Sequence, residues 1–133
     1  MKELKILALK PTTECYHRCG YCSARQVYYN KAIEHSLMDL RFGKKMIDDA
    51  YKLGMRDCLF SGGDPLSYPN ILELIKHARS YEDVFVFMNS DVHNLKIEYA
   101  RRIIEAGLQG WNISIDSMDK SINDKLRGVN GAL

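Results

Sequence analysis

Short apolar runs and longer amphipathic stretches alternate along the chain. Four of the runs are rich in β-branched, aliphatic or aromatic residues and only a few residues long, which is typical of strands. The predicted strands are 4–9, 57–61, 84–88 and 111–116. Because the first run stops at Pro11 and is strongly apolar, we expect a buried strand there. The third run is apolar at every position, so we expect it to be covered on both faces.

The stretches after these runs carry apolar residues at helical spacing. Ser36 and Asp39 together look like a capping box that opens the first helix. Pro69 suits the first turn of the second helix, and Asn94 is predicted to cap the third. The predicted helices are 36–54, 69–78, 94–107 and a short polar one that ends near 127, with glycine as the stop signal at 54 and 107.

This alternation predicts an α/β fold made of parallel (β/α) repeats, about four β-α units in all, joined by right-handed crossovers. The length of 133 residues fits one domain, 1–133. The interval between the first two strands is longer than the others because a cysteine-rich loop and a trailing segment are inserted there. In that segment, we expect Tyr28 and Tyr29 to pack on the core.

Polar motifs follow each predicted strand at its carboxyl end. The motifs are the cysteine loop after the first strand, Gly62-Gly63-Asp64-Pro65 after the second, Asn89-Ser90 after the third and Ser114 to Asp116 at the fourth. Ligands gather at the carboxyl ends of strands in parallel α/β folds. The sequence therefore predicts one active site at this edge of the sheet.

Composition and charge indicate the class of protein but do not identify a binding partner. Apolar residues make up 46% of the chain and charged residues 27%, as in an ordinary globular protein. The net charge of +2 comes from scattered basic residues, which gives no indication of nucleic acid or an anionic membrane. No segment approaches the length of a membrane span, and the start of the chain lacks the features of a signal peptide. We therefore expect a cytoplasmic protein, whose cysteines stay reduced.

The chemistry centres on Cys15, Cys19 and Cys22, spaced C-x3-C-x2-C. Their sulfurs can face one point only if the segment curls, and we expect Gly20 to permit that turn. Three thiolates favour a soft metal centre, and a centre with three protein ligands leaves one position open for chemistry. The alternative is a zinc site with His17 or Cys58 as fourth ligand, although Cys58 fits a buried core cysteine better.

The spacing of the cysteines, with the aromatic Tyr21 before the last one, resembles the signature loop of the radical S-adenosylmethionine (SAM) enzymes. The resemblance implies a partial TIM-like barrel. It also implies that Cys15, Cys19 and Cys22 bind three irons of a [4Fe-4S] cluster, whose fourth iron is chelated by SAM. The reduced cluster would cleave SAM to a 5′-deoxyadenosyl radical that removes hydrogen from a substrate.

The same resemblance implies roles for the polar motifs at the strand ends. Residues 62–65 stand where the family has Gly-Gly-Glu-Pro, which receives the amino group of SAM through bare backbone groups and a carboxylate. Here Asp64 replaces the Glu and is one methylene shorter. The implied SAM contacts are Tyr21 near the adenine, Gly62, Gly63 and Asp64 at the amino group, and Asn89, Ser114, Asp116 and Arg127 at the ribose or carboxylate.

Three of these assignments leave alternatives open. Asp116 either contacts SAM or caps the final helix. Arg127 either pairs with the SAM carboxylate or lies exposed at a helix end. His17 and Arg18, inside the loop, either tune the cluster or face solvent.

The resemblance implies an enzyme whose partners are a reductant such as flavodoxin or ferredoxin and a substrate that is a peptide or a cofactor precursor. The family core usually has six β-α units, so we expect this chain to be the first part of such a core, with an open sheet edge that favours self-association. The alternatives are a zinc-binding interaction domain and an inactive fragment that still binds a cluster.

Overall fold

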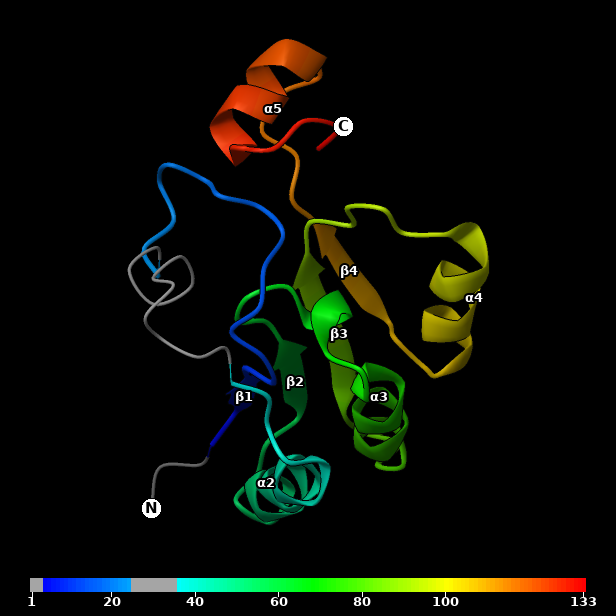
Figure 1. The fold of residues 1–133 in the computed structure, drawn as a ribbon. Coiled ribbons are helices and arrows are strands. Elements are labelled where there is room, and N and C mark those ends of the chain that lie inside the picture. The colour runs from blue at the N-terminus through cyan, green and yellow to red at the C-terminus, as the bar shows by residue number, and fades with distance from the viewer. Residues whose placement is uncertain (1–3, 25–35) are drawn as a thin grey trace.

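Four parallel strands form one sheet in the order β1-β2-β3-β4 (Figure 1). The computed structural model describes residues 4–24 and 36–133. The strands are β1 (Ile6–Leu9), β2 (Asp57–Phe60), β3 (Phe85–Ser90) and β4 (Gly110–Ile113). Because all pairs are parallel, the strands place their carboxyl ends at one edge of the sheet. The predicted α/β class with four β-α repeats is confirmed.

Helices follow the strands along the chain, as the sequence pattern predicts. They are α2 (Leu40–Lys52), the short 3-10 helix η1 (Pro65–Ser67), α3 (Ile71–Arg79), α4 (Ile97–Glu105) and α5 (Lys120–Arg127). Figure 1 shows α5 above the carboxyl ends of the strands, close to the loop that follows β1, while α2 and α3 lie together at the sheet. This position of α5 brings it to the predicted site.

One hydrophobic core joins the sheet to α2, α3 and α4. Phe60 and Met88 on the central strands are fully buried in one cluster with Ile47 of α2 and Ile75 of α3. Burial of one such side chain contributes roughly 1.5–3 kcal/mol. Cys58 lies inside this core, as expected for a structural cysteine, and burial raises its pKa to about 12.

The first and third helices begin differently from the prediction. Ser36 forms no capping box: its backbone pairs with Thr13, and Asp39 itself caps α2 by accepting a hydrogen bond from the Phe42 amide at 2.9 Å. Asn94 does not cap α4, which starts after Lys96, and it has a positive φ of 56°. At both helix starts the predicted capping residue lies in the segment before the helix, because the chain turns into the helix several residues later.

The ends of the second helix and of two strands also differ from the predicted bounds. Pro69 lies before α3, outside its first turn. β3 continues through Asn89 and Ser90, and β4 ends at Ile113, before the predicted limit. The expected buried first strand is only partly buried: β1 is an outer strand, with Leu9 1% and Ile6 53% exposed.

Two expectations stay open after the fold is known. In the ranges 4–24 and 36–133, β4 pairs only with β3, and the self-association expected at its outer edge stays a prediction. The expected packing of Tyr28 and Tyr29 lies outside the described residues. None of the helices in the described part is long and apolar enough to cross a membrane.

Candidate active site

A cavity of about 190 Å³ lies at the carboxyl ends of the strands. It gathers side chains from the loop after β1, the turn after β2, the end of β3, the segment after β4 and the end of α5. Its lining residues are Cys15, His17, Cys19, Tyr21, Cys22, Ser61, Gly62, Gly63, Asn89, Ser90, Asp91, Ser114 and Arg127. Most of the site residues singled out from the sequence therefore meet here, whereas Asp64 and Asp116 stand outside the lining.

Strand-like hydrogen bonds continue past the ends of the sheet and position the polar groups. The Ser61 amide donates to the Leu9 carbonyl at 3.0 Å, and the Ser114 amide donates to the Ser90 carbonyl at 2.9 Å. The Trp111 indole donates to the Ser90 hydroxyl at 2.8 Å. These bonds hold Ser114 at the cavity although β4 itself has ended.

The Gly62-Gly63 turn is packed directly against the chain that leads into the cysteine loop. Gly62 has a φ of 117°, and a Cβ at Gly63 would lie 2.0 Å from the Glu14 carbonyl oxygen. The Gly63 amide donates to the Thr12 carbonyl at 3.0 Å, and the Asp64 amide donates to the Glu14 carbonyl at 2.6 Å. The Gly63 amide is therefore not bare as expected, and together with the Asp64 amide it holds the loop.

Gly20 needs none of the conformational freedom that we expected it to supply. Its φ is not in the left-handed region, and a Cβ at this position would meet nothing within 4 Å. The loop turns without a glycine requirement there. The close contacts that demand glycine lie at Gly63 and, beside the same loop, at Gly128, where a Cβ would lie 2.5 Å from the Arg18 carbonyl oxygen.

The Asp64 carboxylate is turned into the protein. Its side chain is 5% exposed and caps η1 by accepting a hydrogen bond from the Leu66 amide at 3.2 Å. Burial, followed by the charge of the neighbouring Asp91, raises the pKa of Asp64 to about 8. A carboxyl group with this pKa is largely neutral near pH 7.

Asp91 is the main site residue that the sequence reasoning missed. It is 6% exposed and lines the cavity, with Oδ2 3.5 Å from His17 Nδ1 and 3.8 Å from Cys15 Sγ. It also accepts a hydrogen bond from the His93 amide at 2.9 Å. The available signal was its position, directly after Asn89-Ser90 at the end of β3.

His17 faces the interior, so the solvent alternative was wrong for this residue. It is 1% exposed, and its ring lies edge-on to that of His93. Burial lowers the pKa of His17 and favours the neutral ring, and neither ring nitrogen has a hydrogen-bond partner among the described residues. Burial also raises the pKa of the neighbouring Cys15 thiol to about 12. Arg18, in contrast, is exposed.

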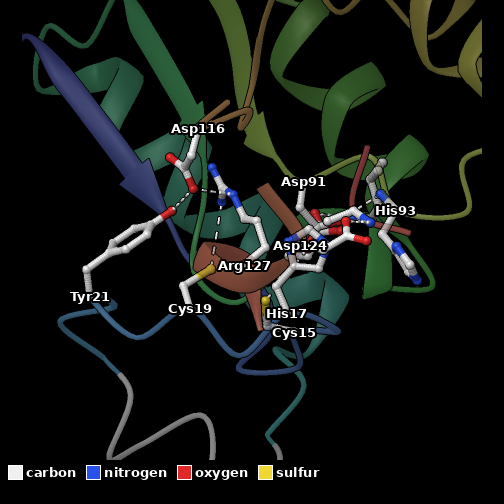
Figure 2. Close-up of polar contacts among 12 residues, drawn as sticks. Cys15, His17, Cys19, Tyr21, Asp91, His93, Asp116, Asp124 and Arg127 are labelled. Carbon is white, nitrogen blue, oxygen red and sulfur yellow. Dashed lines mark hydrogen bonds and ion pairs between the residues drawn. The ribbon is translucent and has the colours of Figure 1, made fainter. Parts of the chain in front are cut away.

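A second group of contacts surrounds Cys19 (Figure 2). Arg127 Nε lies 2.7 Å from Asp116 Oδ2, and Arg127 Nη1 lies 3.8 Å from Cys19 Sγ. The Tyr21 hydroxyl donates to Asp116 Oδ2 at 2.5 Å. The alternative of an exposed Arg127 was wrong. Asp116 does not cap α5, because Asp119 accepts the bond from the Ile122 amide.

The three thiols of the loop suit an iron–sulfur cluster better than a single metal ion. Within the described ranges, no three His, Cys, Asp or Glu side chains are placed to hold one ion together. Each thiolate of a cubane cluster binds its own iron, so the sulfurs need only face one cavity, as these do. Cys58 is enclosed by the core and does not line the cavity, which removes it from the zinc alternative.

Comparison with known proteins identifies one enzyme superfamily. The family model described as the radical SAM superfamily matches residues 9–132. The chain is 30% identical over 128 residues to an AdoMet-dependent heme synthase of Nitratidesulfovibrio vulgaris, covering 96% of this chain and 34% of that protein. It is 25% identical over 132 residues to a GTP 3′,8-cyclase of Nostoc, covering 98% of this chain and 40% of that protein.

Solved structures share the fold. Streptococcus suis SuiB bound to S-adenosylmethionine matches 96% of this chain and 27% of its own, with a TM-score of 0.74 and 17% identity. BtrN in complex with AdoMet and 2-DOIA matches 96% of this chain and 53% of its own, with a TM-score of 0.72 and 19% identity. This chain thus spans well under two thirds of the length of these curated relatives.

Proposed function

Because the chain belongs to the radical SAM superfamily, we propose that residues 1–133 form part of a radical SAM core domain and serve an enzyme that cleaves SAM reductively to abstract hydrogen from a substrate. One observation carries this proposal. The three cysteines of the loop line the same cavity as the glycine turn after β2 and the polar residues at the ends of β3 and β4.

Cys15, Cys19 and Cys22 would hold a [4Fe-4S] cluster in this proposal. When bound, a reduced cluster supplies the electron for reductive cleavage of SAM. The chain keeps the loop in place through the Gly63 and Asp64 amides on one side and through Arg127 on the other. Burial of Cys19 and His17 keeps water away from the inner side of the loop.

The cavity residues offer SAM both acceptors and donors. We assign the carboxylate that faces the SAM ammonium group to Asp91, since Asp91 lines the cavity and Asp64 does not. The raised pKa of Asp64, about 8, favours its neutral form, so Asp64 adds little negative charge at this end of the cavity. The side chains of Asn89 and Ser114 lie at the same cavity and suit the ribose hydroxyls. Tyr21 lies at its mouth, where the adenine ring would stack.

The substrate class proposed is a peptide or a cofactor precursor. Support comes from the names of the relatives, a heme synthase and a GTP 3′,8-cyclase, and from SuiB, whose structure was also solved with the precursor peptide SuiA. The reaction needs an external one-electron reductant, for which we propose a flavodoxin or ferredoxin. The substrate class and the reductant are proposed for the whole enzyme, not for residues 1–133 by themselves.

Anaerobic reconstitution with iron and sulfide, followed by EPR of the dithionite-reduced chain with and without SAM, tests the proposal. We expect the signal of a reduced [4Fe-4S] cluster that changes when SAM is added. Replacing Cys15, Cys19 or Cys22 by alanine should abolish that signal. Cys58→Ala is the matched control, because Cys58 lies in the core and should leave the cluster intact.

Three results would separate the alternatives. A colourless chain that binds zinc stoichiometrically and no iron would overturn the enzyme proposal in favour of a zinc-binding interaction domain. A cluster whose EPR signal does not respond to SAM would support a fragment that binds a cluster without the SAM site. Formation of 5′-deoxyadenosine by the reduced chain would establish cleavage.

A further inference from the structure

We propose that Arg127 is a positioning residue of the cluster loop, which fixes Cys19 and places a positive charge beside its sulfur, rather than a partner of the SAM carboxylate. This inference rests on the proposed function, because it concerns the cluster that Cys19 would bind. It assigns Arg127, Asp116 and Tyr21 to one structure, here called the Cys19 clasp. Figure 2 shows its four residues turned toward one another.

Arg127 is buried and forms an ion pair with Asp116 of the same chain. The side chain comes from the last residue of α5 and is 8% exposed. Its Nε lies 2.7 Å from Asp116 Oδ2, while its Nη1 lies 3.8 Å from Cys19 Sγ. A buried guanidinium needs paired acceptors, and here one carboxylate and one sulfur supply them. These two contacts orient the guanidinium toward Asp116 and the cysteine loop.

Backbone contacts show that α5 and the loop form one unit. The Arg18 amide donates to the Arg127 carbonyl at 2.8 Å. Directly after it, Gly128 ends α5 in the left-handed conformation, and a Cβ there would lie 2.5 Å from the Arg18 carbonyl oxygen. The end of α5 is thus pressed against the residue that precedes Cys19. Such close packing leaves the loop little freedom next to that cysteine.

Tyr21 closes the clasp from the other side of Cys19. Its hydroxyl donates to Asp116 Oδ2 at 2.5 Å, and Arg127 Cζ lies 5.9 Å from the centre of its ring. The phenol is the donor in this hydrogen bond, since the carboxylate of Asp116 can only accept. One carboxylate therefore ties both the arginine and the tyrosine around the cysteine.

This arrangement has an electrostatic consequence for a bound cluster. Reduction adds a negative charge to the cluster, and a nearby positive charge stabilises the reduced form. Arg127 should therefore raise the reduction potential, and Asp116 should lower it. The two members of one ion pair are expected to act with opposite signs, which a purely structural role would not produce.

The test is a redox titration, followed by EPR, of the reconstituted chain and three variants. Arg127→Gln should lower the midpoint potential of the cluster, and Asp116→Asn should raise it. Arg101→Gln removes an equal charge from the exposed surface of α4 and should leave the potential unchanged. Circular dichroism checks the fold of each variant, and SAM affinity is measured in parallel.

The outcomes separate this inference from the proposed function. An unshifted potential in folded Arg127→Gln, with SAM affinity reduced tenfold or more, would overturn the clasp and restore the SAM carboxylate as the partner. Shifts of the same sign in both variants would also overturn it. If Arg127→Gln does not fold, the sign of the shift in Asp116→Asn decides. A wild-type chain that forms no cluster would overturn the proposed function, and the inference with it.

Discussion

At the scale of single residues, Gly63 leaves the least room for a side chain among the glycines compared in the described part of the chain. Gly63 lets the turn after β2 approach the Glu14 carbonyl so closely that a Cβ would lie 2.0 Å from the oxygen. Contacts below 3.0 Å to backbone force a displacement, because backbone cannot rotate away as the end of a side chain can. The segment that must move begins one residue before Cys15.

Gly63→Ala should therefore abolish or strongly reduce cluster assembly, because the added methyl group displaces the start of the cysteine loop. Gly20→Ala is the control, since a Cβ there meets nothing within 4 Å. Iron and sulfide content per chain after reconstitution measures the effect. Full iron content in Gly63→Ala, or loss of iron in Gly20→Ala, would contradict this account of how the loop is held.

At the scale of elements, helix starts were the least predictable feature. Asp39 and Asp119 cap α2 and α5 by accepting bonds from the amides three residues on. Ser36, which the local pattern favoured, instead belongs to the segment that meets the β1 loop, where its amide donates to the Thr13 hydroxyl at 3.0 Å. A residue can cap a helix only at the position where the chain enters the helix. The position of that turn at α2 depends on the contact between Ser36 and Thr13.

Asp39→Ala should lower the free energy of unfolding by about 1 kcal/mol, because the Phe42 amide would lose its acceptor. Ser36→Ala should cost much less, since Ser36 contacts Thr13 through its backbone. Urea unfolding followed by circular dichroism at 222 nm measures both. Equal losses in the two variants would favour the capping box instead.

At the scale of the whole molecule, the site joins segments that are far apart in the chain. Its walls come from the β1 loop, the β2 turn, the ends of β3 and β4, and α5, so no single β-α unit contains it. A ligand that bridges these segments stabilises the entire fold, because it binds the folded chain and has no site in the unfolded one.

SAM should accordingly raise the unfolding temperature of the cluster-loaded chain. At a concentration one hundred times its dissociation constant, the added stability is about 2.7 kcal/mol. The same concentration should have little effect on Cys19→Ala, which lacks one cluster ligand. Thermal unfolding under anaerobic conditions compares the two. An equal rise in both chains would show that SAM binds independently of the cluster.

Local sequence patterns predicted those features that depend only on the residues of a single element. Apolar runs identified the four strands of the described residues, glycine at position 54 ended α2, and the spacing of the three cysteines indicated a soft metal centre. Placing the polar motifs at one edge also needed no structure, because parallel strands put their carboxyl ends together. The fold class and the gathering of the polar motifs at one edge of the sheet were therefore determined by the sequence alone.

The tertiary structure decided which groups face the cavity and which are already paired. Asp91 and Asp64 both follow strands, yet only Asp91 lines the cavity, because Asp64 turns inward to cap η1. Arg127 looks like an exposed helix end until α5 is docked on the cysteine loop, where burial commits it to Asp116 and Cys19. The burial and pairing of these polar side chains depend on residues distant in the chain, so periodicity and local spacing did not reveal them.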